Sequence, residues 1–174
     1  MHKIIAASVA SLFIAGCASV PGPTTQMLAQ TTLLSSQGNP MGTAQLLSNG
    51  STLSLAITAN GLEAGEHGFH LHTTGSCVAP DFKSAGGHLN PDNNEHGTLN
   101  PQGSHLGDLP NLVVGATRTT SVEVDIGEDT AQRRSAIFDA DGTALVIHAG
   151  PDDYRTDPAG DAGARVACGV MQPA

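Results

Sequence analysis

Aromatic and positively charged residues are both scarce in this chain of 174 residues. It has no tryptophan, one tyrosine and four phenylalanines, and seven Lys and Arg stand against sixteen Asp and Glu, so the net charge is −9. Proteins that bind nucleic acid need a basic surface to meet the phosphates, so this composition argues against a nucleic-acid partner. An anionic substrate would need a local positive charge to draw it toward an acidic whole.

Long hydrophobic runs are also missing. The apolar stretch Ile4–Ala15 follows a short positive start and is too short to span a bilayer comfortably. It ends in Ile14-Ala15-Gly16-Cys17, which resembles the lipobox of bacterial lipoproteins. The resemblance implies a signal peptide over residues 1–16, a lipidated Cys17 and a protein anchored in the periplasm, with the outer membrane favoured over the inner. An ordinary secretory signal with a chance cysteine is the alternative.

Cysteine is limited to three residues. If Cys17 carries lipid, Cys77 and Cys168 remain as an even pair in an oxidising compartment, where disulfides persist. A bond between them would close a loop of about 91 residues and stabilise the fold by at most about 4–5 kcal/mol. Two free buried thiols are the alternative. Residues 17–26 are expected to form a flexible tether, which leaves residues 27–174 as one domain.

Alternating apolar residues predict strands in this domain. The clearest alternations are Leu53, Leu55, Ile57 and Ala59, and then Val122, Val124 and Ile126. Asn49-Gly50 predicts the turn of a hairpin, because both residues tolerate positive φ. No ten-residue window has convincing helical periodicity. The expected fold is therefore all-β, a Greek-key barrel or sandwich.

Two long segments, residues 74–111 and 149–163, are rich in Gly, Pro, Asn and Asp and do not fit strands. Structureless loops of this length are usually functional or disordered. The first of them contains His88, His96, His105 and Asp108. Metal binding by these side chains could supply the order that a hydrophobic core does not.

Histidine, unlike the residues above, is concentrated in the chain. On a strand, His70 and His72 project to one side while Phe69 and Leu71 project to the other. With the apolar pair facing the core, we expect the two histidines on the outer surface, close enough to share an ion. His148 has the same arrangement on a later strand. Imidazole is the commonest protein ligand for copper and zinc, so six clustered histidines and a carboxylate indicate more than one ion.

Five short motifs resemble the copper/zinc superoxide dismutase family, in particular its exported bacterial members. They are HGFHLH (67–72), GGHLNP (86–91), HLGDL (105–109), LVIH (145–148) and GARVACG (163–169). The resemblance implies an immunoglobulin-like Greek-key β-barrel with two long functional loops. It also implies an enzyme that converts superoxide to dioxygen and hydrogen peroxide, with one copper and one zinc per chain.

The resemblance further implies two ligand sets that share one residue. The copper ligands would be His70, His72, His88 and His148, and the zinc ligands His88, His96, His105 and Asp108. His88 would then bridge the ions and carry a proton to the substrate. His67 is structural in the family and is left out of both sets.

The same resemblance assigns roles beyond the ligands. Asp152 would hydrogen-bond one copper histidine and one zinc histidine, although a solvated loop acid is the alternative for it. Arg165 would guide superoxide to the copper, since a guanidinium offers planar donors and a permanent charge. Lys83 could add positive potential nearby.

Other function classes stay open at this point. A periplasmic copper or zinc buffer would need the same ligands but would have no use for Arg165. A structural lipoprotein with vestigial metals is a third class. A membrane contact through the N-terminal lipid follows from Cys17, and both a monomer and a homodimer are compatible with the sequence.

Overall fold

The structure is a computed structural model and describes residues 24–174. The expected signal peptide, Cys17 and most of the expected tether lie outside the described residues. Within residues 24–174, no helix has both the length and the apolar character needed to cross a membrane.

Strands dominate the described part of the chain, with one short α-helix, α1 (Ala131–Ile137), and one 3-10 helix, η1 (Lys83–Ala85). In chain order the strands are β1 (Gln26–Ser35), β2 (Pro40–Ser48), β3 (Thr52–Asn60), β4 (Gly65–His67), β5 (Phe69–His72), β6 (Leu112–Val114), β7 (Thr119–Glu128), β8 (Ala144–His148), β9 (Arg165–Val170) and β10 (Gln172–Pro173).

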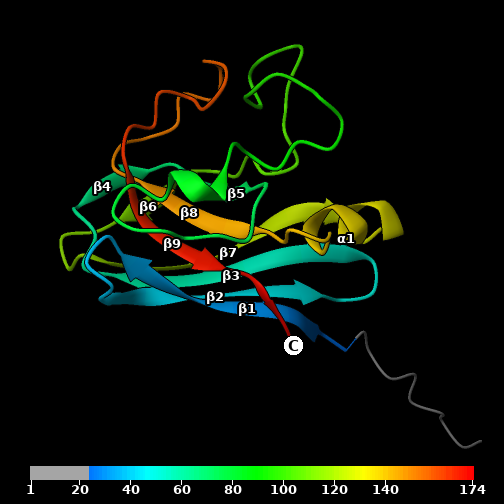
Figure 1. The fold of residues 1–174 in the computed structure, drawn as a ribbon, viewed down its shortest axis with the longest axis horizontal. Helices are drawn as coiled ribbons and strands as arrows, with labels where there is room; N and C mark the ends of the chain where they lie inside the picture. The colour runs from blue at the N-terminus through cyan, green and yellow to red at the C-terminus, as the bar shows by residue number, and fades with distance from the viewer. Residues whose placement is uncertain (1–23) are drawn as a thin grey trace, which may run out of the picture.

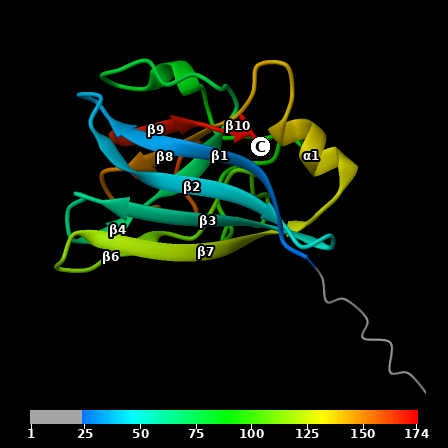
Figure 2. The ribbon, with the colours of Figure 1, turned by 90° about the horizontal axis from the view of Figure 1, so that it is seen from below.

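The strands form a barrel of antiparallel pairs. The main sheet has the order β5-β8-β9-β1-β2-β3-β7, with β10 added to β1 (Figures 1 and 2). A small sheet of β4 and β6 completes the ring, because β4 runs on into β5 and β6 contacts β7. Neighbours that lie far apart in sequence, such as β3 with β7 and β5 with β8, make this a Greek-key arrangement. The predicted fold class is confirmed.

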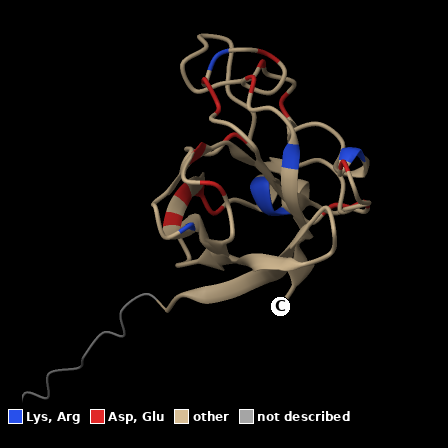
Figure 3. Ribbon diagram, turned by 90° about the vertical axis from the view of Figure 1, so that its left-hand side faces the viewer, with Lys and Arg blue, Asp and Glu red and all other residues tan. Residues whose placement is uncertain are grey.

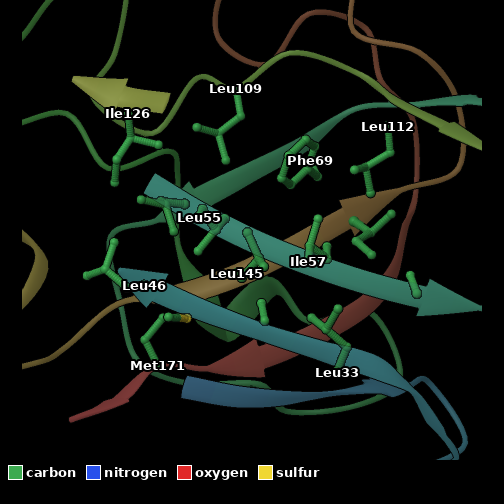
Figure 4. Close-up of a cluster of buried hydrophobic side chains, with 14 of the residues drawn as sticks. Leu33, Leu46, Leu55, Ile57, Phe69, Leu109, Leu112, Ile126, Leu145 and Met171 are labelled. Atoms are coloured by element: carbon green, nitrogen blue, oxygen red, sulfur yellow. The ribbon is translucent and has the colours of Figure 1, made fainter. Parts of the chain in front are cut away.

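The interior of the barrel is packed with apolar side chains from opposite walls. Leu53, Leu55, Ile57 and Ala59 are all buried on one face of β3, as the alternation predicts. They meet Phe69 and others from the facing strands (Figure 4). Burial of a leucine-sized side chain contributes about 1.5–3 kcal/mol, so this face fixes the register of each strand.

The predicted hairpin at Asn49-Gly50 is also confirmed, since β2 and β3 flank it. Gly50 has a φ of 87°, and the Asn49 side chain accepts hydrogen bonds from the backbone of Ser51 and Thr52. The expectation of no helix missed α1. This helix is capped by Thr130, whose side chain accepts from Arg133 N–H, and at seven residues it is too short to show a period.

Two long loops, residues 73–111 and 149–164, rise on the side of the barrel beyond β5 and β8 (Figure 1). We call them the loop layer. The first loop is fastened by the disulfide between Cys77 and Cys168, which confirms the predicted pairing. Beneath it, Phe82 and Ala85 pack on Val146 and Cys168 and form a second, smaller core. The loop layer is therefore attached to the outer face of β8 and β9.

Candidate metal centre

Strands β5 and β8 supply three of the histidines that gather under the loop layer. His70 and His72 lie on β5, and His148 ends β8, which pairs with β5. Isolated bridges bring the first loop beside β5, joining His72 to His88 and His70 to Asp108. Strand pairing thus places residues from distant parts of the chain at one point.

The expectation that His70 and His72 lie on the outer surface is wrong in one respect. They do point away from the barrel interior, but both have an exposed fraction of 0%. The loop layer covers this face of β5, so the strand is buried on both sides. A two-residue alternation predicts which face a side chain takes, but it cannot predict what later covers that face.

The first set consists of His70, His72, His88 and His148, whose nearest ring nitrogens all lie within 4.8 Å of one another. In three of them the other nitrogen has a fixed partner. His70 Nε2 lies 2.7 Å from Asp152 Oδ2, His72 Nδ1 donates to the Gly86 carbonyl at 3.0 Å, and His148 Nδ1 donates to the Gly163 carbonyl at 3.1 Å. These bonds set the tautomer and the direction of each ring.

The remaining nitrogens of this set are buried and have no hydrogen-bond partner among residues 24–174. They are His70 Nδ1, His72 Nε2, His88 Nε2 and His148 Nε2. A buried polar atom with no partner costs about 1–3 kcal/mol, so four of them facing one another would be expensive if nothing bound there. Four converging imidazole nitrogens form a donor set that suits copper. The first set therefore fits a copper ion.

The second set is arranged around one carboxylate oxygen. Asp108 Oδ1 lies 2.9 Å from His88 Nδ1 and 3.1 Å from both His96 Nδ1 and His105 Nδ1. His105 Nδ1 is 3.4 Å from His88 Nδ1. Four tetrahedral ligands with bonds of about 2.0–2.1 Å stand about 3.3 Å apart, which is the usual geometry of zinc. Three nitrogens and one oxygen at these separations fit a zinc ion.

His88 belongs to both sets and Asp152 connects them. His88 presents Nδ1 to the second set and its unpartnered Nε2 to the first. Asp152 is 3% exposed, and its Oδ2 faces His70 while its Oδ1 faces His96 Nε2 at 3.0 Å. The carboxylate thus joins one histidine of each set, as expected for it, and is not a solvated loop acid.

Burial keeps three imidazoles of the first set neutral. It lowers the pKa of His72 to about 2, with repulsion from His88 as a further cause, and that of His148 to about 3. Burial also lowers the pKa of His88 to about 4, despite its contact with Asp108. Neutral rings keep a lone pair available for a metal at physiological pH.

Contacts between histidines and carboxylates shift the pKa values of His96, Asp108 and Asp152 against the effect of burial. Burial acts to lower the pKa of His96, but hydrogen bonds to Asp108 and Asp152 outweigh it and raise the value to about 9. Burial also opposes ionisation of Asp108 and Asp152, yet contacts with histidines hold the pKa of each well below its usual value. Both carboxylates are therefore charged and offset part of any metal charge.

Arg165, at the start of β9, is half-buried beside the first set. Its guanidinium donates to the carbonyls of Phe82 and Gly86, each at 2.7 Å. Gly86 is also the carbonyl that accepts from His72, so one backbone group connects the arginine with a histidine of the first set. Lys83 has an 82% exposed side chain and pairs with Asp81 at 3.2 Å. Along the ribbon of the two long loops, Asp and Glu recur while Lys and Arg are few (Figure 3).

His67 belongs to neither set. It is buried, and its ring contacts the carbonyls of His148 and Glu63 at 2.7 and 2.9 Å. Sequence analysis missed the carbonyls of Gly86 and Gly163, because no side chain marks a backbone acceptor. It also missed Asn111, which pairs with the backbone of Asp152.

Comparison with known proteins agrees with this geometry. A family model described as copper/zinc superoxide dismutase matches residues 41–171. Superoxide dismutase (Cu-Zn) 2 of Aquifex aeolicus is 43% identical over 147 residues, or 83% of this chain and 86% of that protein. Superoxide dismutase-like protein YojM of Bacillus subtilis is 44% identical over 143 residues, or 80% of this chain and 73% of that protein.

The crystal structure of a SOD-like protein from Bacillus subtilis superposes with a TM-score of 0.78 at 42% identity, covering 83% of this chain and 99% of that one. Sequence, fold and donor sets thus lead to the same assignment. The chain belongs to the copper/zinc superoxide dismutase family.

Proposed function

We propose that this protein binds copper at His70, His72, His88 and His148 and zinc at His88, His96, His105 and Asp108, and that it dismutates superoxide in the cell envelope. The observation that carries the proposal is the convergence of four buried, unpartnered imidazole nitrogens in the first set. The reaction is inferred from membership of the copper/zinc superoxide dismutase family. When bound, copper provides the one-electron chemistry that yields dioxygen from one superoxide and hydrogen peroxide from the next.

The residues of the chain orient the metal-binding rings, attract the anionic substrate and protonate the product. Asp152 fixes the ring of His70 so that Nδ1 points into the first set. His88 would hold a proton on Nε2 for the peroxide product while that nitrogen is not bound to copper, because Nε2 faces the first set and has no other partner among the described residues. The contacts of Asp108 orient the other side of the same ring.

Arg165 is the anion-binding residue of this proposal. Its guanidinium is held by two carbonyls and therefore keeps one position, with donors left over for a small anion. The chain as a whole is acidic, so a fixed local cation is what an anionic substrate needs. Lys83 is a weaker contributor, since it is exposed and already paired with Asp81.

The cellular setting is part of the proposal. The Cys77–Cys168 disulfide supports an oxidising compartment, and the motif before Cys17 supports export with lipid attachment to the outer membrane. Mass spectrometry of the mature protein from bacterial membranes tests this point. The expected N-terminus is a lipidated Cys17, and an unmodified N-terminus elsewhere in residues 18–26 would contradict it.

The central test is a metal and activity titration of the purified protein. We expect one copper and one zinc per chain, and superoxide decay measured by pulse radiolysis that rises in proportion to copper. Chelation should abolish the activity and copper should restore it. A protein that takes up both metals but leaves the decay of superoxide unchanged would instead be a metal buffer on the same fold.

A further inference from the structure

Asn111, the last residue of the first loop before β6, and Tyr154 of the second loop form a polar connection that the function proposed above does not use. The Asn111 side chain pairs with both backbone groups of Asp152: Oδ1 accepts from its N–H and Nδ2 donates to its carbonyl, each at 2.9 Å. The backbone N–H of Asn111 donates to the Tyr154 hydroxyl at 2.8 Å. We call these two residues the clasp.

Tyr154 continues the clasp to the carboxylate and to the first loop. Its N–H donates to Asp152 Oδ1 at 2.6 Å, and its carbonyl accepts from Leu99 N–H at 3.0 Å. Gly97 lies so close to this carbonyl that a Cβ added there would collide with it. The contacts of Tyr154 with Leu99 and Gly97 therefore fix the two long loops to each other close to Asp152.

The clasp rests on a rigid part of the molecule. Asn111 directly precedes β6, which pairs with β4, and β4 leads through Gly68 into β5. The second loop has no strand or helix between β8 and β9, but its backbone is hydrogen-bonded on either side of Asp152, as between Asp153 N–H and the Gly160 carbonyl at 3.0 Å. Among the described residues, no backbone group pairs with the N–H or the carbonyl of Asp152 itself, and the Asn111 side chain takes both. Pairing by Asn111 of both the N–H and the carbonyl fixes the backbone of Asp152 and leaves only the two side-chain torsions free. The contacts with Tyr154, His70 and His96 then restrict those torsions.

We propose that Asn111 and Tyr154 are positioning residues for Asp152, which hold its carboxylate between His70 and His96 and so slow the release of zinc. This inference rests on the proposed roles of Asp152 and His96. Outer-shell partners of metal ligands typically contribute 10–100-fold to affinity, and the clasp acts one step further out. Its loss should therefore cost about tenfold or less.

The experiment measures the rate at which loaded protein loses zinc to a chromogenic chelator. Asn111→Ala should speed the loss by about tenfold, and Tyr154→Phe, which removes only the hydroxyl, by about threefold. Asn49→Ala is the matched control, because it also deletes a hydrogen-bonded asparagine but in the β2–β3 turn. That control should leave zinc release unchanged even if it lowers the melting temperature.

The same substitutions in an Asp152→Asn background separate positioning from general stability. If the clasp acts through the carboxylate, Asn111→Ala should speed zinc loss by less than about twofold once Asp152 has been changed. An equal acceleration in both backgrounds would overturn the inference and leave the role of Asp152 intact. A single Asp152→Asn variant with normal zinc release would overturn both the inference and that role.

Discussion

Inside the barrel, Leu55, Ile57 and Phe69 are buried among other apolar groups and need no polar partner, whereas six histidines and Asp152 are buried between the loop layer and the strands beneath it. Apolar burial is non-directional and tolerates small displacements, while hydrogen bonds and metal bonds demand particular atoms at particular distances. The barrel therefore stabilises the fold, and the loop layer uses that stability to hold a polar site that could not form alone.

The largest effect is expected from His88→Ala. This substitution removes the one ring that belongs to both sets, so superoxide dismutation should fall below detection in protein supplied with both metals. Pulse radiolysis provides the measurement, and far-UV circular dichroism should report an intact barrel. His105→Ala, which alters the second set alone, should lose zinc but still bind copper. Near-normal turnover in a metal-replete His88→Ala variant would count against the mechanism.

A substitution in the barrel core should act first on the stability of the fold, whereas His88→Ala acts first on activity. Leu145→Ala opens a cavity in the barrel and should lower the free energy of unfolding of the metal-free protein by about 2–5 kcal/mol in urea. Val113→Ala is the matched control, because Val113 is 67% exposed on β6 and should change stability by less than about 0.5 kcal/mol. Equal effects of the two substitutions would contradict the assignment of the barrel as the stabilising region.

Arg165→Ala should separate substrate attraction from metal binding. We expect both metals to remain bound while kcat/KM falls by about tenfold or more and becomes less sensitive to ionic strength. Lys83→Ala should change kcat/KM by less than about twofold, because its charge is exposed and paired with Asp81. A larger loss from Lys83 than from Arg165 would reverse the assignment of the guiding cation.

Acid should destabilise the metal-free protein through the first set. The pKa values of His72 and His148 are about 2 and about 3 in the folded protein, against about 6.5 when unfolded. The unfolded state therefore binds more protons between these limits, and stability is lost as the pH falls below about 6.5. His96 has the opposite sign, because its raised pKa of about 9 gives a contribution that is lost as the pH rises from about 6.5 through 9.

Thermal melts of the chelated protein across this pH range measure the balance between the contribution of His72 and His148 and that of His96. Replacing His148 with Gln keeps a similar volume but removes the titrating ring, so the melting temperature should depend less on acid. An unchanged acid dependence in that variant would show that other groups dominate the window.

Sequence alone predicted the β-class, the β2–β3 turn and the cysteine pairing. The first two depend on residue type and short spacing, such as the alternation in β3, and the third on the two cysteines that remain after Cys17. The two ligand sets follow from the family resemblance and stay a prediction, although the structure gathers the same residues into two groups. The helix α1 was missed because its seven residues, about two turns, are specified by a Thr130 cap and not by a period. The burial of His70 was missed because it depends on Asp108 and Asp152, which lie far along the chain in the two long loops.

The sequence by itself determined which atoms can bind metal and which strand faces they occupy, since side-chain chemistry and the two-residue alternation of strands are local properties. Only the tertiary structure decided how those atoms meet. The pairing of β5 with β8 and the folding of the first loop onto β5 bring His88 between the two sets. The loop layer also buries the ring nitrogens of the first set that have no hydrogen-bond partner within residues 24–174. These are long-range contacts, and no local pattern of residues specifies them.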